Sequence, residues 1–546
     1  MRTAVMIALA AISVTPATAD TLVDHVDGLQ VGRTGKLQHF TGLVIGKDGK
    51  VVQLLGASDA RPTRIKMRID GQGHALLPGL IDAHGHVMEL GAAALSLDLT
   101  DTHSLAELQQ RLKAYAAAHL GTGWIQGRGW NQELWPVKNF PTAADLDGIV
   151  PSRPVVLRRV DGHALIANSA AMRAAGVTAE TTAPSGGLIE QGLFVDNAMT
   201  LIESKIAPAT KTERNAWLAK ALEILRGYGL TATADMGTDP ADWAAMRRAG
   251  RRGELTTRIM SYGAGIDGAK AISADGPTAW FSRDRLKMEG VKLYADGALG
   301  SRGAWLKAPY ADKPDTRGLQ FHSDADYDAL VAEAARRRYQ IATHAIGDAA
   351  NAQVIRSYIG HGASDGDRRW RIEHVQVVAP EDLALIGANH IIASMQPTHQ
   401  TSDRTMAEAR LGPARLAGAY AWHSMIVTGA HLAFGSDYPV ESANPFPGIA
   451  AAISRQDPRG QPPGGWRPEE KVTLAQALAS FTREAAYAGF AEDRLGSLDP
   501  GHWADFIMVD RDIASATPID IAAMKVLETW VAGKKVWASE PVAPAR

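Results

Sequence analysis

The chain has 546 residues, of which 46% are hydrophobic and 21% charged; these values are close to those of soluble globular proteins and exclude a disordered or fibrous chain. Its 57 basic and 59 acidic residues give a formal charge of −2, which removes the electrostatic case for a nucleic-acid or anionic-membrane binder and favours a small-molecule partner. With no cysteine and 17 histidines, the chain cannot form disulfides or cysteine zinc sites, and any metal site must use imidazole, carboxylate or modified lysine.

The N-terminus has the pattern of a secretory signal. Arg2 precedes an apolar run at 4–14, which is followed by Pro16 and by small residues that end at Ala19. This order predicts a signal peptide over 1–19 that is cleaved after Ala19. A buried N-terminal helix is the alternative, and Pro16 disfavours it. No later segment has the roughly 18 uninterrupted apolar residues of a membrane span, so we expect an exported, periplasmic protein.

Both ends of the remaining chain are rich in short β-like pieces. In 20–74 these include residues 42–45 and 51–55, and in 491–546 they include 505–510 and 526–531. Neither end alone is long enough to bury a good core. We therefore expect the two ends to pair into one composite β-sandwich around a central domain.

The central region, 75–490, alternates short apolar runs with segments of helical spacing, such as 326–339 and 379–386. The runs that we expect to be parallel strands are 75–81, 231–234, 258–262, 290–294, 340–343, 370–372, 391–395 and 431–434. Eight strands with helices between them predict an α/β fold of the TIM type, a (β/α)₈ barrel.

The interval after the first run is too long for a simple barrel crossover. It spans about 150 residues, whereas a crossover with its helix needs roughly 30. We therefore predict a cap inserted after barrel strand 1, at about 90–230. The strand-like run at 154–160 and the tryptophans Trp124, Trp130 and Trp135 indicate that this cap is folded.

The first candidate ligands lie in the sequence Leu-Pro-Gly-Leu-Ile-Asp-Ala-His-Gly-His at 77–86. His84 and His86 are two residues apart at the end of a strand, so both imidazoles can face one ion. Such a pair alone is a weak signal. Its position at the carboxyl end of a barrel strand strengthens it, because barrel active sites lie at that face.

Four later strands end in further groups that could bind metal: Lys292, His344, His374 and Asp437. Each has a structural alternative, such as a hydrogen-bonded core histidine, a lysine reaching the rim or an aspartate capping a helix. Six such groups at the same end of five strands favour a shared site over coincidence.

These motifs together resemble the amidohydrolase superfamily, and amidohydrolase family 3 in particular. They are the 77–86 segment, Val-Lys-Leu-Tyr-Ala-Asp-Gly-Ala-Leu-Gly-Ser-Arg at 291–302, His-Ala-Ile-Gly-Asp at 344–348, Arg-Ile-Glu-His at 371–374, Gly-Ser-Asp-Tyr-Pro-Val at 435–440 and Leu-Gly-Ser-Leu-Asp-Pro-Gly-His-Trp-Ala-Asp at 495–505. The resemblance covers essentially the whole chain after the signal. It implies a metal-dependent hydrolase on a distorted barrel with a composite β-sandwich.

Carried over by position, the resemblance implies two divalent metal ions. His84, His86 and Asp437 would bind the more buried ion, and His344 with His374 the second. Lys292 would be an N6-carboxylysine that bridges the ions, because two cations stabilise an anionic carbamate. Imidazole and oxygen ligands suggest zinc, with manganese, cobalt or iron left open.

The implied reaction is hydrolysis of an amide, N-acyl or N-formyl bond of a small molecule by a metal-bound hydroxide, with Asp437 as general base and then acid. A deaminase, or an ester or lactone hydrolase, would use the same site. A noncatalytic binding protein is a further alternative, which the presence of all six ligands disfavours. A homodimer is left open.

Other polar or aromatic residues are candidates for contacting the substrate. Trp130 and His163 belong to the cap, Asp296 and Arg302 follow the lysine strand, and Gln396 and His399 follow the seventh run. Each could serve a structural role instead, and Asp296 with Arg302 could simply pair with each other.

Overall fold

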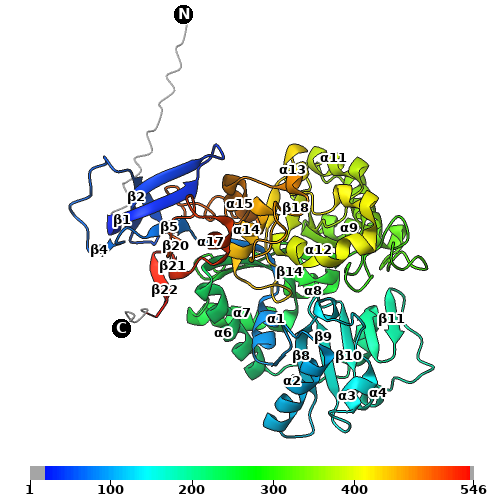
Figure 1. The fold of residues 1–546 in the computed structure, drawn as a ribbon. Coiled ribbons are helices and arrows are strands. Elements are labelled where there is room, and N and C mark those ends of the chain that lie inside the picture. Colours follow the sequence, from blue (N-terminus) through cyan, green and yellow to red (C-terminus); the bar gives the residue numbers. More distant parts are fainter. Residues whose placement is uncertain (1–18, 541–546) are drawn as a thin grey trace, which may run out of the picture.

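The computed structural model describes residues 19–540, so all of the expected signal peptide except Ala19 lies outside the described residues. Figure 1 shows a central barrel, a lobe formed by the cyan insertion, and a β-domain in which the blue and red ends of the chain lie side by side. Within 19–540, no helix is both long and apolar enough to cross a membrane.

The barrel consists of eight parallel strands, as the sequence predicts. They are β6 (Leu80–Gly85), β13 (Leu230–Thr238), β14 (Arg258–Ala264), β15 (Leu286–Tyr294), β16 (Gln340–Ala345), β17 (Arg371–His374), β18 (Ile392–Met395) and β19 (Leu432–Phe434). Each pairs with the next along the chain, and a parallel bridge between Gly85 and Tyr438 brings the last strand to the first. The expected (β/α)₈ architecture is confirmed.

The helices of the barrel include those expected at 326–339 and 379–386. They are α6 (Lys211–Gly227), α7 (Pro240–Arg252), α8 (Gly265–Ile272), α9 (Asp324–Arg336), α10 (Asp348–Gly360), α11 (Pro380–Ala388), α12 (Pro397–Leu411), α13 (Trp422–Val427), α14 (Pro445–Ser454), α15 (Leu474–Ser480) and α16 (Arg483–Ala488). Helix α7 shows why they form locally. Asp239 accepts a hydrogen bond from the Asp242 N–H, Pro240 occupies the first turn, and Gly253 ends the helix at a φ of 74°.

Both chain ends contribute to one 8-stranded sheet. Its strands are β1 (Ala19–Val31), β2 (Leu37–Gly46), β3 (Val51–Leu55), β4 (Met67–Asp70), β5 (Ala75–Pro78), β20 (Phe506–Val509), β21 (Val526–Val531) and β22 (Lys534–Ala538). Strand β5 joins the two ends, because it pairs with β1 on one side and with β20 on the other. The composite β-domain expected from the sequence is therefore present.

The apolar run at 75–81 is divided between two domains. Its first half, β5, belongs to the composite sheet, and its second half opens the barrel strand β6. Gly79 separates them and lies so close to β13 that an added Cβ would be 2.1 Å from the Thr231 hydroxyl. Hydrophobicity alone does not mark this break, because both halves are buried.

The insertion after β6 and α1 (Val87–Ala94) has its own 6-stranded sheet and its own core. Its elements are β7 (Leu97–Asp98), α2 (Leu105–Ala118), β8 (Ile125–Trp130), α3 (Ala143–Asp147), β9 (Val155–Arg159), β10 (Ala164–Ala167), α4 (Ser169–Ala175), β11 (Gly187–Glu190), β12 (Leu193–Asp196) and α5 (Thr200–Glu203). Leu112, Trp130, Trp135 and Leu157 pack together in that core. The cap is thus a folded unit, as expected.

A buried ion pair joins the barrel to the composite sheet. The Arg258 guanidinium donates to both carboxylate oxygens of Asp505, at 2.6 and 3.0 Å, and Ala532 N–H donates to the same carboxylate. Asp505→Ala would leave the fully buried guanidinium without its anion. We expect it to lower the free energy of unfolding by about 3–5 kcal/mol, measured by urea denaturation. Asp315→Ala, at an exposed position, is the control, and equal stability of the two variants would contradict this expectation.

Candidate metal centre

The six side chains expected to bind metal line one cavity of about 590 Å³ at the carboxyl ends of the barrel strands. His84 lies in β6, Lys292 in β15, His344 in β16 and His374 at the end of β17, while His86 and Asp437 follow β6 and β19. His374 and Asp437 adopt left-handed backbone conformations, with φ of 76° and 60°. Such conformations are costly for non-glycine residues and cluster at functional sites.

The ligand-type atoms of these residues lie close together. His86 Nε2 is 3.0 Å and His84 Nε2 3.4 Å from Asp437 Oδ1, and the three residues each offer one ligand atom within 4.8 Å of the others. Lys292 Nζ is 3.5 Å from His84 Nε2. The ring centroids of His374 and His344 are 4.5 Å apart. The fold therefore brings together all six residues that the sequence singles out.

The hydrogen bonds of three histidines leave one ring nitrogen of each free to bind a metal. His84 Nδ1 donates to Glu373 Oε2 at 2.6 Å, and His374 Nδ1 donates to Gln396 Oε1 at 2.8 Å. His344 Nε2 donates to the Gly297 carbonyl at 3.4 Å. Because these oxygens only accept, the opposite nitrogen of each neutral ring keeps its lone pair. The donor set therefore fits divalent metal ions.

Burial reinforces this protonation pattern. It lowers the pKa of His84 to about 4 and the pKa values of His344 and His374 well below their ordinary value, which keeps the imidazoles neutral. Burial also lowers the pKa of Lys292 to about 8. Burial opposes ionisation of Asp437, but the imidazoles of His84 and His86 outweigh it and hold the pKa of this carboxyl below its ordinary value.

Comparison with known proteins agrees with this geometry. Residues 68–537 match the sequence profile of the amidohydrolase family. The chain belongs to the amidohydrolase family. It is 32% identical to Protein LONG AFTER FAR-RED 3 of Arabidopsis thaliana, over 86% of this chain and 84% of that protein. It is 30% identical to the putative amidohydrolase YtcJ of Bacillus subtilis, over 85% of this chain and 89% of that protein.

Two further comparisons concern activity and structure. The amidohydrolase chain is 25% identical to the N-substituted formamide deformylase of Arthrobacter pascens, over 85% of this chain and 89% of that enzyme. The crystal structure of an uncharacterized metal-dependent hydrolase from Pyrococcus horikoshii matches with a TM-score of 0.73 and 26% identity, over 91% of this chain and 99% of that one. The protein is therefore a metal-dependent hydrolase of the amidohydrolase superfamily.

The amidohydrolase has a second cluster beside the first, formed by His374, His399 and Asp437. His399 Nε2 lies 3.6 Å from Asp437 Oδ2, and Gln376 Nε2 lies 3.0 Å from His399 Nδ1. The sequence suggests only a substrate contact for His399. The structure places its ring next to the carboxylate that also faces His84 and His86.

Of the other substrate candidates, His163 lines the cavity. Gln396 holds His374 in place, as described above. Trp130 is fully buried in the core of the insertion, where its indole N–H donates to the Leu157 carbonyl, and it lies outside the cavity lining. This placement gives Trp130 a packing role.

Asp296 and Arg302 do not pair with each other. The buried Asp296 carboxylate accepts hydrogen bonds from the backbone N–H groups of Trp305, Ile346 and Gly347, so it shapes the loops around the site. Arg302 donates to Asp312 instead, at 2.9 Å. Neither residue is among those that line the cavity.

Several residues at the site carry no role in the sequence analysis. Glu373 is fully buried, orients His84 and is itself bound by the Arg371 guanidinium at 2.7 Å. Its position directly before His374 is the signal that could have identified it. On the insertion side, Arg128 and Arg158 line the cavity and pair with Glu89 and Glu203. No local pattern marks these four residues, because the packing of the insertion against α1 and the barrel decides which of them meet.

Glu373→Gln is expected to weaken metal binding by about 10- to 100-fold, because the His84 ring loses the anion that fixes its tautomer and orientation. Competition with a chromophoric chelator measures this affinity. Glu381→Gln is the matched control, since that side chain is largely exposed and pairs with Lys307. Equal metal affinities for the Glu373 variant and the wild type would contradict the expected role.

Proposed function

We propose that this amidohydrolase hydrolyses a carbon–nitrogen bond in a small amide, N-acyl or N-formyl compound at a centre of two divalent metal ions. One observation carries the proposal: four histidines, a buried lysine and an aspartate from the ends of five barrel strands meet in a single cavity. The cavity volume of about 590 Å³ suits a small molecule. The formamide deformylase among the relatives, whose name specifies a C–N substrate, supports the bond type.

In this proposal His84, His86 and Asp437 hold one ion, and His344 and His374 hold the other. When bound, two zinc ions would polarise the carbonyl and lower the pKa of a water molecule. Lys292 would bridge the ions as N6-carboxylysine. Its amine adds carbon dioxide with formation of an N–C bond and release of one proton, and its burial and lowered pKa favour the reactive, uncharged amine.

Asp437 would be the catalytic residue. Its Oδ1 faces His84 and His86, and its Oδ2 faces His399, so both oxygens lie inside the cluster of histidines. The carboxylate would take the proton of the attacking water and deliver it to the leaving nitrogen. Neither transfer requires the protein to supply a second acid.

A substrate screen of the zinc-loaded mature protein tests this function. The panel contains N-acyl and N-formyl amines, dipeptides, cyclic imides, lactones and amino-substituted heterocycles, with metal content measured on the same sample. Hydrolysis of an amide or formamide that chelators abolish would support the proposal. Cleavage of lactones alone, or release of ammonia from a heterocycle alone, would replace it with the corresponding alternative. If a fully metallated sample hydrolyses none of these compounds, a noncatalytic binding protein is favoured.

We also propose that residues 1–19 direct export to the periplasm and are then removed. Strand β1 begins at Ala19, so cleavage there would leave the strand nearly whole. We expect N-terminal sequencing of the periplasmic fraction to begin at Asp20. A chain that stays in the cytoplasm with its first residues intact would contradict this expectation.

A further inference from the structure

His163 is a histidine of the insertion that lies next to the candidate metal-binding residues of the barrel. It lies between β9 and β10, lines the cavity, and has its ring centroid 4.9 Å from that of His344. Its side chain is 16% exposed. The insertion therefore places one imidazole beside the barrel histidines. This imidazole does not belong to their clusters of potential metal-ligand atoms.

Asp196 fixes the orientation of this ring. Its Oδ1 lies 2.6 Å from His163 Nδ1, and the Asp196 side chain is 1% exposed. Asp196 ends β12 with a φ of 49°, a conformation that costs a non-glycine residue free energy. On the barrel side, a Cβ at Gly297 or Gly303 would lie 2.3 or 2.4 Å from Asp196 Oδ2. Two glycines thus let a barrel loop close around the carboxylate.

The hydrogen bond to Asp196 determines what the other ring nitrogen can do. A carboxylate accepts, so Nδ1 carries a proton, and in the neutral ring Nε2 keeps its lone pair. Burial opposes a charge on His163, but the hydrogen bond to Asp196 outweighs it and raises the pKa of His163, so the ring is an acceptor above that pKa. Among the described residues, no hydrogen bond uses His163 Nε2, and the atom is not sealed from the cavity. The ring therefore offers an oriented acceptor beside the reaction centre.

We propose that His163 Nε2 accepts a hydrogen bond from the N–H of the scissile amide, so that the insertion selects substrates with an N–H at the bond that is broken. This inference rests on the proposed function. The physical reason is that a buried N–H without an acceptor loses the hydrogen bonds it made to water. An ester has no N–H at this position and gains nothing from the acceptor.

The test compares a 4-nitroanilide with the 4-nitrophenyl ester of the same acyl group, chosen from the acyl groups that the screen selects. We expect His163→Phe to lower kcat/KM for the anilide on the order of 10- to 100-fold, and to leave the ester nearly unchanged. Asp196→Asn should produce the same selective loss. An asparagine amide can donate to Nδ1, which moves the ring proton to Nε2 and removes the acceptor. The double variant should be no worse than His163→Phe alone.

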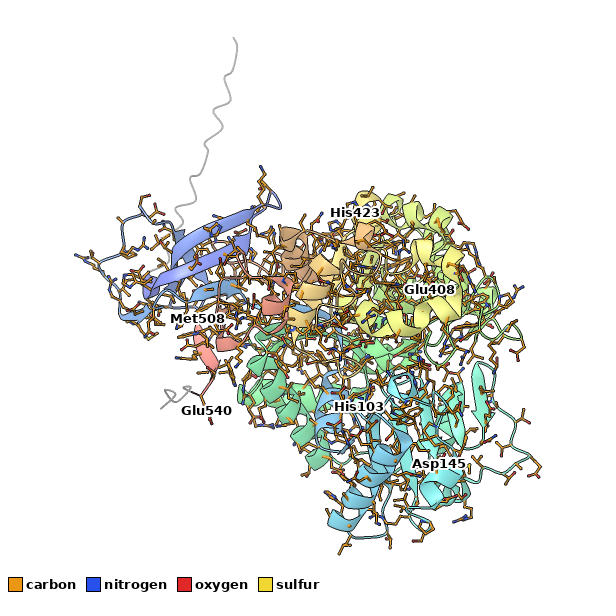
Figure 2. The ribbon with its side chains drawn as sticks, viewed as in Figure 1. His103, Asp145, Glu408, His423, Met508 and Glu540 are labelled. Atoms are coloured by element: carbon orange, nitrogen blue, oxygen red, sulfur yellow. The ribbon has the colours of Figure 1, made fainter. Side chains whose placement is uncertain are left out.

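His103→Phe is the control, because this histidine lies on the same insertion, is exposed and lies outside the cavity lining (Figure 2). Equal loss of anilide and ester hydrolysis in His163→Phe, or a fall in its metal content, would overturn the inference. So would an anilide kcat/KM within about threefold of the wild type. If the wild type cleaves only esters, the proposed function fails and the inference fails with it. If the wild type and the variant cleave the anilide equally well, the inference alone fails.

Discussion

Asp437→Asn is expected to lower kcat/KM on the order of 10³-fold, the largest effect we expect from any single isosteric change in this protein. The amide has no basic oxygen to take a proton from water, and it is a weaker, uncharged ligand. Steady-state kinetics with the best substrate from the screen measures the loss. Since the same side chain would both transfer the proton and bind metal, metal content must be measured on the same preparation.

Two outcomes separate the roles of Asp437. A variant that keeps its metal but loses activity assigns the carboxylate to proton transfer, whereas a joint loss of both assigns it mainly to metal binding. Asp365→Asn, on an exposed loop, is the isosteric control and should behave like the wild type. Wild-type kcat/KM in the Asp437 variant would remove this residue from the mechanism.

Lys292→Ala is expected to lower the metal content from about two ions per chain to about one and to reduce kcat/KM on the order of 10²-fold. Alanine cannot form a carbamate, so no anion is left to bridge the two positions. Elemental analysis of the purified variant measures the stoichiometry. Thermal unfolding in the presence of zinc shows whether the variant is folded.

Lys287→Met is the matched control for Lys292, because it removes another buried lysine from the same strand, β15. Lys287 pairs with Glu289 and donates to the Phe490 carbonyl, away from the cavity. Loss of metal in both variants would indicate a general effect of strand damage. A Lys292 variant that keeps the wild-type stoichiometry would contradict the bridging role.

Local sequence was sufficient to single out the candidate metal-binding residues that the fold brings together. His84 and His86 are two residues apart on an extended segment, which places both side chains on the same side, and the parallel strands put Lys292 and His344 at the same end of the sheet. The composite β-domain was also predictable, because neither end of the chain could bury a core alone. These inferences depend on spacing and periodicity, which the sequence contains directly.

The hydrogen-bond partners of these candidate ligands, and of the candidate substrate contacts, were decided only by the tertiary structure. Glu373 orients His84 across the barrel, Arg302 pairs with Asp312 and not with Asp296, and Trp130 turns into the insertion core. Periodicity indicates on which side of a strand a side chain lies. Which side chain it contacts depends on how segments distant in the sequence pack together.

The same distinction applies to the histidines. The sequence itself determined that a metal site in a chain without cysteine must use nitrogen and oxygen ligands, and it singled out His84, His86, His344 and His374 from the 17 histidines. The packing of the insertion on the barrel decided that His163 also faces the cavity, with Asp196 enclosed by Gly297 and Gly303. Such contacts arise when separately folded units meet, and no local pattern in either unit encodes them.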